Sequence, residues 1–221
     1  DGATNYYKVE EYYKVRYTDQ QIYLLDYQRS MEQIIDTASV NVSGNILSVG
    51  VTSDTTGYLS NETGTIVSFV QSGQLFEYNQ NKQTFTKVYG FIDDPTDARQ
   101  SYGQHNIRIL NIDETGNMDF VVYGYMNRGQ HEGESGIDLY HYDSIKQEAI
   151  EQVFIATTHS YQILNADFSD LLYENADGDF YIMMGGTLAK VGLDDLSTKE
   201  LITNLKSDQY AVSSSGRYVA W

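Results

Sequence analysis

A strand-turn-strand pattern runs from Leu139-Tyr-His-Tyr-Asp143 to Ile150-Glu-Gln-Val153. Apolar and polar residues alternate in both segments, which is typical of β-strands with one buried face. Asp143 closes the first segment. Asp and Asn side chains at such a position bond to backbone two residues further on and start a turn. The stretch therefore predicts a β-hairpin.

The same pattern occurs three more times, with an Asp or Asn closing each first strand. The copies are Ile22–Asp26 leading to Met31–Ile35, Leu75–Asn79 leading to Phe85–Val88, and, more weakly, Leu188–Asp194 leading to Leu201–Leu205. The closing residues are about 50 to 65 positions apart, a period that is typical of β-propeller blades and not of helical solenoids.

Further strands are predicted around these hairpins. Ile109–Asp113 and Ile163–Asp167 are similar segments, each expected to open a unit. Met118–Tyr125 is almost continuously apolar, which favours a strand buried on both faces. A tight turn at Ser72-Gly73 predicts that the strand before it and the strand after it form a hairpin.

The end of the chain resembles a known repeat. Tyr210–Trp221 has an apolar strand, a turn at Ser213-Ser-Ser-Gly216 and an apolar-aromatic strand, and it resembles the opening strand pair of a TolB-type β-propeller repeat. The Pro and Asp expected in that turn are missing, so the match is partial. The resemblance implies a fold and no activity.

We therefore expect an all-β, β-propeller-like fold of about four blades of antiparallel strands. Residues 1–221 would form a single domain, with approximate units 6–36, 40–91, 105–155 and 161–205. Residues 209–221 would either close the ring on the first unit or begin the next blade of a larger propeller, of which this chain is a fragment. Closure would remove exposed strand edges.

Composition narrows the choice of partners. The chain has 14 Lys and Arg against 31 Asp and Glu, a net charge of −17, which disfavours nucleic acid and anionic membranes as partners. The negative charge either serves only to keep the protein soluble, or it attracts cations or a basic protein. The absence of cysteine excludes disulfides and thiolate metal sites. No apolar run approaches the ~18 residues of a membrane span, so no membrane insertion is expected. The start at Asp1 indicates a processed or trimmed protein, so we expect a secreted or cell-surface location. The alternative is that the chain is part of a longer protein that is anchored at the cell surface.

A glycine-rich loop between two predicted strands, Tyr123–Gly136, is the candidate binding site. Its mixed charges and amides single out six residues as candidate ligand-binding residues: Tyr125, Asn127, Arg128, His131, Glu132 and Glu134. The competing interpretation is a long solvated hairpin loop. No catalytic residue is nominated.

We expect no metal or other cofactor. The four histidines, at 105, 131, 141 and 159, are too widely spaced to indicate a metal site. The segments Asp93–Asp97 and Asp177–Asp179 offer oxygens to calcium, but neither has EF-hand spacing, and turns are the favoured interpretation.

The functional hypothesis is a non-catalytic extracellular or cell-surface binding or scaffold domain that recognises a protein or a glycan. Its tyrosine-rich surface, with 20 Tyr in the chain, suits large contact areas. The alternative is a carbohydrate-active enzyme with a glycoside hydrolase-like propeller, which needs two facing carboxylates, one with a raised pKa. A third hypothesis is a purely structural domain of a longer protein.

Overall fold

The computed structural model describes residues 4–37, 40–43, 46–50, 57–170, 172–175, 179–192, 197–206, 208–213 and 218–221. Eighteen strands and one helix occur within these ranges. The first eight strands are β1 (Tyr6–Tyr17), β2 (Ile22–Ile34), β3 (Asn41–Ser43), β4 (Ile46–Ser48), β5 (Tyr58–Ser60), β6 (Ile66–Gln71), β7 (Gln74–Asn79) and β8 (Thr84–Gly90). The next elements are β9 (His105–Ile112), β10 (Met118–Tyr125), β11 (Ser135–Asp143), β12 (Glu148–Ala156), α1 (Tyr161–Asp170) and β13 (Leu172–Glu174). The last are β14 (Asp179–Met184), β15 (Thr187–Gly192), β16 (Thr198–Ile202), β17 (Ala211–Val212) and β18 (Val219–Ala220).

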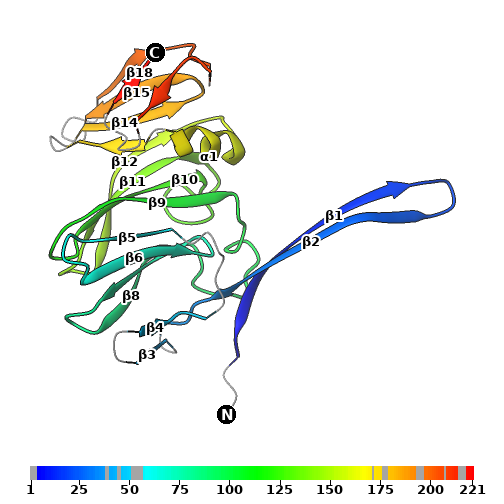
Figure 1. Cartoon of the computed structure of the whole chain (residues 1–221), viewed down its shortest axis with the longest axis horizontal. Helices are drawn as coiled ribbons and strands as arrows, with labels where there is room; N and C mark the ends of the chain where they lie inside the picture. Colours follow the sequence, from blue (N-terminus) through cyan, green and yellow to red (C-terminus); the bar gives the residue numbers. More distant parts are fainter. Residues whose placement is uncertain are drawn as a thin grey trace.

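Three four-stranded antiparallel sheets form the body of the molecule. The first sheet has the order β5-β6-β7-β8, the second β9-β10-β11-β12 and the third β13-β14-β15-β16, so each is a simple meander. Three two-stranded sheets, β1-β2, β3-β4 and β17-β18, complete the described strands. The prediction of an all-β fold is therefore confirmed. Figure 1 shows the three larger sheets stacked one upon another, with β1 and β2 projecting from them as an arm.

The core lies between the stacked sheets. Leu75 of the first sheet packs with Phe120 and Val122 of the second. On the other side of the second sheet, Val121 packs in a cluster with Phe180 of the third sheet, and α1 contributes to the same cluster. Consecutive residues of β10 thus point into different clusters, as the two-residue period of a strand requires. This explains why Met118–Tyr125 is almost continuously apolar, and it confirms the prediction of a strand buried on both faces.

Several predicted hairpins are confirmed. β6 and β7 are joined at Ser72 and Gly73, whose φ angles are 53° and 73°. Positive φ at both central residues matches the two-residue turns whose twist suits a hairpin. The strands at 75–88 and 139–153 pair as predicted. β15 pairs with β16, while Asp194, predicted to close β15, lies outside the described residues.

The prediction of a hairpin within 22–35 is wrong. β2 is one strand from Ile22 to Ile34, and Asp26 lies in its middle opposite Lys14 of β1. The turn lies earlier, where the Thr18 backbone N–H donates to the carbonyl of Gln21 at 3.0 Å. A β-bulge at Leu25 shifts the register beside Asp26, and pairing along the rest of β1 outweighs the local turn tendency of a single aspartate.

The prediction of an opening strand at Ile163–Asp167 is also wrong, because these residues belong to α1. Leu164 and Phe168, one helical turn apart, are both fully buried between the second and third sheets, whereas Ile163 is 45% exposed. The backbone N–H of Leu164 donates to the carbonyl of Ser160 at 3.1 Å and begins the helix. The burial of Leu164 and Phe168 between two sheets therefore favours a helix over a strand at this segment.

Within the described residues, the segment 209–221 does not pair with the first unit. β17 and β18 pair with each other, and β1 pairs with β2. Val212 and Val219 pack against Met183 and Leu188 of the third sheet. The terminal strand pair therefore continues the stack beyond the third sheet, at the far end of the body from β3 and β4 (Figure 1).

Candidate functional site

The base of the arm is held against the turn between β6 and β7. One carboxylate oxygen of Glu32 accepts hydrogen bonds from both the backbone N–H and the hydroxyl of Ser72, each at 3.1 Å. The side-chain amide of Gln71 donates to the carbonyl of Gln33 at 2.9 Å. These bonds join residues that are about forty positions apart in the chain and fix where the arm leaves the body.

A polar depression of about 290 Å³ lies at this junction. The arm contributes Lys8, Glu10 and Glu32, and the body contributes mainly amides, hydroxyls and rings: Ser72, Gln100, Ser101, Gln104, His105, Asn106 and Tyr161. A larger hollow of about 470 Å³ shares Glu32, Ser72, Gly73 and Asn106 with it and extends to Arg108 on β9. The two adjoin at these shared residues beside the base of the arm and together are called the concavity. The depression is lined mainly by polar groups, whereas the larger hollow is also lined by Leu59, Val70, Ile107 and Ile109.

Charge in the depression is mixed. Lys8 Nζ lies 3.2 Å from Glu10 Oε1, so these two charges partly neutralise each other. Burial lowers the pKa of His105 to about 4, so its imidazole is neutral at pH 7. Its Nε2 lies 3.3 Å from the carbonyl oxygen of Gly73. The depression therefore presents neutral hydrogen-bonding groups together with one cation and two carboxylates.

The loop predicted as the site lies between β10 and β11. Its backbone closes on itself, because Met126 N–H donates to Glu134 O at 2.8 Å and Gly133 N–H donates to Met126 O at 3.0 Å. Asn127 is buried, and its side-chain amide donates to the carbonyls of Gln100 at 3.1 Å and Tyr102 at 2.8 Å. Asn127 thus positions the segment that lines the depression.

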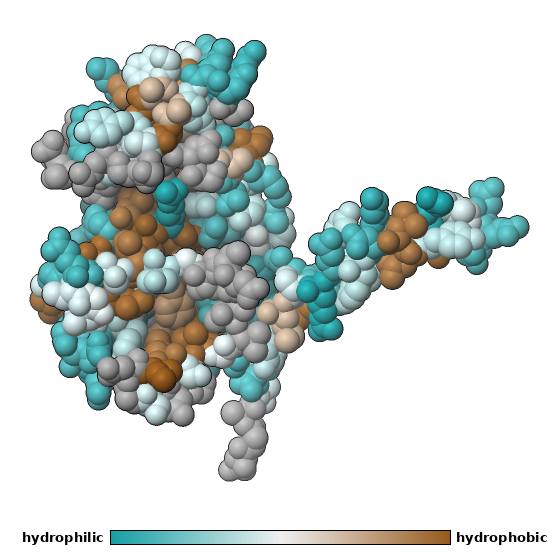
Figure 2. Space-filling model, in the orientation of Figure 1, coloured by the Kyte–Doolittle hydropathy of each residue, from teal (hydrophilic) through white to brown (hydrophobic). Residues whose placement is uncertain are grey.

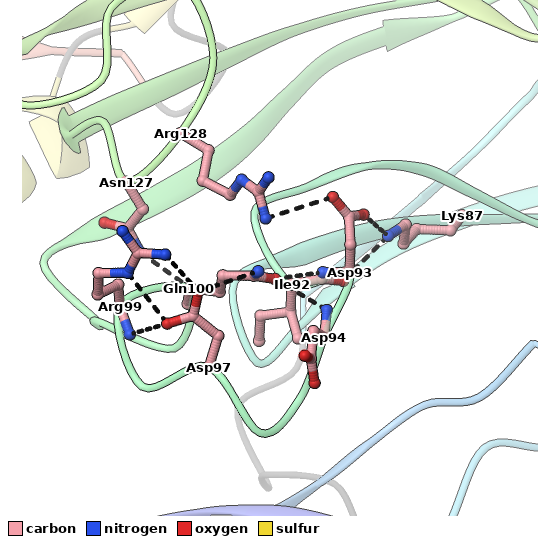
Figure 3. A network of polar contacts seen from close by, with 9 residues as sticks. All are labelled: Lys87, Ile92, Asp93, Asp94, Asp97, Arg99, Gln100, Asn127 and Arg128. Carbon is pink, nitrogen blue, oxygen red and sulfur yellow. Dashed lines mark hydrogen bonds and ion pairs between the residues drawn. The ribbon is translucent and has the colours of Figure 1, made fainter.

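Arg128 and its neighbours belong to the same network of contacts (Figure 3). Arg128 lies 3.9 Å from Asp93, which also pairs with Lys87 at 2.9 Å. The side-chain carbonyl of Gln100 accepts hydrogen bonds from the backbone N–H groups of Asp93 at 2.7 Å and Asp94 at 2.9 Å. The loop therefore holds the segment 92–102 at two places, through Asn127 near its end and through Arg128 near its start.

The other predicted residues lie in different directions. Tyr125 makes an edge-to-face contact with Tyr102, with ring centroids 5.4 Å apart. His131 stacks on Phe154 of β12 with centroids 3.6 Å apart, and its Nε2 lies 3.1 Å from Glu151. Burial alone would lower the pKa of His131, but the hydrogen bond and charge of Glu151 outweigh it and raise the pKa.

His131 Nδ1 also lies 3.8 Å from Glu134, while Glu132 is exposed. The six predicted residues thus do not converge on one cavity. Tyr125 and Asn127 contact the segment that lines the depression, Arg128 reaches Asp93, and His131 with Glu134 faces β12. Sequence reasoning missed the lining residues of the depression, whose only local signal is the polar segment Gln100–Asn106.

The acidic segment 93–97 is built as turns. Asp94 Oδ1 accepts bonds from the backbone N–H of Thr96 at 2.9 Å and from its hydroxyl at 2.7 Å. Asp97 accepts from the backbone and the side chain of Arg99, and these bonds lower the pKa of Asp97 to about 2. Within the described ranges, no three His, Asp or Glu residues are grouped to hold a metal ion. Asp177 lies outside those ranges.

Two buried carboxyl groups lie away from the concavity. Burial raises the pKa of Glu77 in β7 to about 7, and it raises the pKa of Asp138 in β11 to about 7 as well. Asp138 accepts a 2.7 Å hydrogen bond from the hydroxyl of Tyr140. Neither carboxyl lines the depression or the adjoining hollow. Their environment is that of groups enclosed within stacked sheets.

Comparisons with known proteins give only distant likenesses. No family model matches the chain, and no curated protein matches it. Among solved structures it is similar to Porphyromonas gingivalis dipeptidyl peptidase 4, with 9% sequence identity and a TM-score of 0.30 over 87% of this chain and 38% of that one. It is also similar to the extracellular domain of BT4673 from B. thetaiotaomicron, with 10% identity and a TM-score of 0.28 over 89% of this chain and 31% of that one. The chain thus spans less than half the length of the proteins it matches. Among the described helices, none has the length and apolar character needed to cross a bilayer.

Proposed function

We propose that this chain is a non-catalytic, extracytoplasmic binding module that recognises a glycan in the polar concavity at the base of the arm. The observation on which this depends is the lining of the depression, in which neutral amides, hydroxyls, a neutral histidine and a tyrosine ring surround about 290 Å³. Ligand cavities measure roughly 300–1,000 Å³, so the depression with its adjoining hollow has room for a sugar residue or two.

The chemistry of the lining favours a sugar over other small molecules. Sugar hydroxyls both donate and accept hydrogen bonds, as do the side-chain amides of Gln104 and Asn106, which line the depression. The carboxylates of Glu10 and Glu32 can accept further hydrogen bonds from hydroxyl groups. An apolar ligand would displace water from this polar lining without replacing the hydrogen bonds of that water, and each polar group desolvated in this way costs roughly 1–3 kcal/mol.

We also propose that the three four-stranded sheets are consecutive blades of a β-propeller. Each is an antiparallel meander, each packs its face on the next sheet, and the terminal pair β17-β18 stacks on the third sheet in the same manner. In such a ring the loops at one end present a binding surface.

The test is a glycan array followed by calorimetry on the bound glycan. Gln104→Ala removes a side chain that lines the depression, and we expect affinity to fall about fivefold to tenfold, the value of one net hydrogen bond. The matched control is Gln130→Ala, the same substitution at an exposed position of the β10-β11 loop. The proposal fails if no glycan binds at millimolar concentration, or if both variants lose affinity equally.

The enzyme alternative has a separate outcome. A glycosidase requires a carboxyl of raised pKa beside the substrate. Among the described residues, the two carboxyls whose pKa is raised, Glu77 and Asp138, lie outside the concavity. We therefore expect the bound glycan to be recovered intact after prolonged incubation at high protein concentration. New reducing ends that appear with time would establish hydrolysis and contradict a purely binding role.

A further inference from the structure

The arm is amphipathic across its two faces. β1 and β2 pair along their lengths with one bulge at Leu25, and directly opposed residues such as Val9 and Met31, or Tyr13 and Tyr27, share a face. One face holds nine large side chains that are mostly apolar: Tyr7, Val9, Tyr13, Val15, Tyr17, Ile22, Leu24, Tyr27 and Met31. The opposite face is mainly polar, with Tyr6, Lys8, Glu10, Tyr12, Lys14, Arg16, Tyr23, Asp26, Gln28, Ser30, Glu32 and Ile34.

The polar elements within the apolar face are paired internally. Glu11 lies at its centre, accepts hydrogen bonds from the hydroxyls of Tyr13 at 2.9 Å and Tyr27 at 2.7 Å, and lies 3.8 Å from Arg29. These bonds lower the pKa of Glu11, so the carboxylate stays ionised beside its arginine. The apolar face thus has one neutralised ion pair surrounded by aliphatic and aromatic groups.

Nothing in the described chain covers this face. The nine side chains are between 39% and 74% exposed, and Figure 2 shows hydrophobic groups on the arm well away from the body. A two-stranded ribbon is marginally stable in water, and it needs a partner on its apolar face. The alternation of apolar and polar side chains is nevertheless regular on both sides of the bulge at Leu25.

The exposed area is large enough for a specific interface. Residues of roughly 150–250 Å² each, exposed to these fractions, present on the order of 900 Å² on one arm. A standard protein interface buries about 800 Å² on each partner. Two arms packed through their apolar faces therefore meet the size of a stable dimer interface.

Charge favours a second copy of the chain at this place. Residues 6–34 contain four basic and five acidic residues, so sixteen of the seventeen net negative charges lie outside the arm. Two acidic bodies repel each other, whereas two nearly neutral arms can approach. One self-complementary patch on each copy is also what a two-fold dimer requires.

We propose that the apolar face of the arm is a two-fold interface between two copies of this chain, in which the two ribbons pack face to face. The polar face stays free, and its basal residues Lys8, Glu10 and Glu32 continue to line the depression. Dimerisation and ligand binding therefore use opposite faces of the same ribbon, and the two do not compete.

The test compares two double variants with equal added charge. Val15→Glu with Leu24→Glu places carboxylates at directly opposed positions on the apolar face, and Tyr12→Glu with Gln28→Glu does the same on the polar face. Sedimentation over a range of concentrations should show a dimer for the unaltered chain and for the polar-face variant. The apolar-face variant should dissociate at least about tenfold more readily, because carboxylates buried at the interface lack partners.

A second measurement uses single substitutions that add no charge to the arm. The chain has no cysteine, so Val15→Cys and Gln28→Cys each introduce a single exposed thiol. In a dimer, maleimide should label the thiol at 15 more slowly at high than at low protein concentration, and it should label the thiol at 28 equally at both. A chain that stays monomeric at about 100 µM, as when another segment or a different protein covers the arm, overturns the proposal. Equal dissociation of both double variants, or equal labelling at both thiols, also overturns it.

Discussion

Replacement of Glu77 by Gln should stabilise this protein at alkaline pH and change little in acid. Glu77 is 6% exposed on β7, a strand whose six residues are all buried, and burial raises its pKa from 4.5 to about 7. A carboxyl with a raised pKa in the folded state binds its proton more tightly there than in the unfolded chain. Its destabilising effect is therefore small near pH 4.5, grows as the pH rises, and is complete above about pH 7.

The magnitude follows from the shift in pKa. A difference of about 2.5 units at 1.36 kcal/mol per unit gives about 3 kcal/mol at pH 8, and it gives less than about 1 kcal/mol at pH 5. Gln is neutral at both values of pH and nearly the same size as Glu. Urea unfolding of the Glu77→Gln variant should thus show a gain of about 3 kcal/mol at pH 8 relative to the unaltered chain, and a much smaller gain at pH 5.

Glu200→Gln is the control for this measurement, since Glu200 is exposed on β16 and its replacement should change stability equally at both values of pH. A Glu77→Gln gain that is the same at pH 5 and pH 8 would refute the reasoning, because only a protonation equilibrium makes the effect depend on pH. A loss of stability at pH 8 would show that the ionised carboxylate has a stabilising partner.

Two further predictions concern the stacked body and the depression. The pKa of His105 is lowered from 6.5 to about 4, so folding favours the neutral ring. The free energy of unfolding should therefore fall by up to about 3 kcal/mol as the pH drops from 6.5 to 4. Urea unfolding of a His105→Gln variant should show most of this pH dependence lost. A Cβ at Gly124, where φ is +115°, would lie 2.3 Å from the carbonyl oxygen of Gln104, so Gly124→Ala should lower the thermal midpoint sharply. Gly129→Ala, at a φ of +93° with open space around it, should cost only about 1 kcal/mol of backbone strain, and similar midpoints for the two variants would contradict the packing argument.

Local hairpins were predictable because their signals are local. The turn at Ser72-Gly73 and the alternation on either side of it are sufficient to pair β6 with β7. The long apolar segment of β10 likewise indicates burial on both faces, whatever the neighbouring sheets are. These features depend on residues within about ten positions of one another.

The errors come from contacts that are distant in the chain. Asp26 has the character of a turn residue, yet it lies in mid-strand because β1 offers a partner for all of β2. Ile163–Asp167 resembles a strand, yet it is helical because Leu164 and Phe168 fill the space between two sheets. In both cases the free energy of long-range burial and pairing exceeds the local preference.

At the candidate site, too, the local features were predictable and the contacts between distant residues were not. The β10-β11 loop was found from its glycines and charges, but the direction of its side chains was not. Asn127 turns inward to bond the backbone of Gln100 and Tyr102, and His131 turns to stack on Phe154. The depression itself combines the arm, the β6-β7 turn and residues 100–106.

By itself, the sequence determined the all-β class, most of the local hairpins and the acidic character of the surface, because the two-residue period of apolar side chains and the turn residues act over short distances. The projecting arm of β1 and β2, the helix at 161–170 and the polar depression between arm and body all depend on contacts between distant parts of the chain. The physical reason is that sheets from distant parts of the chain decide which surfaces are buried, and the burial of apolar surface stabilises the fold more than local conformational preferences do.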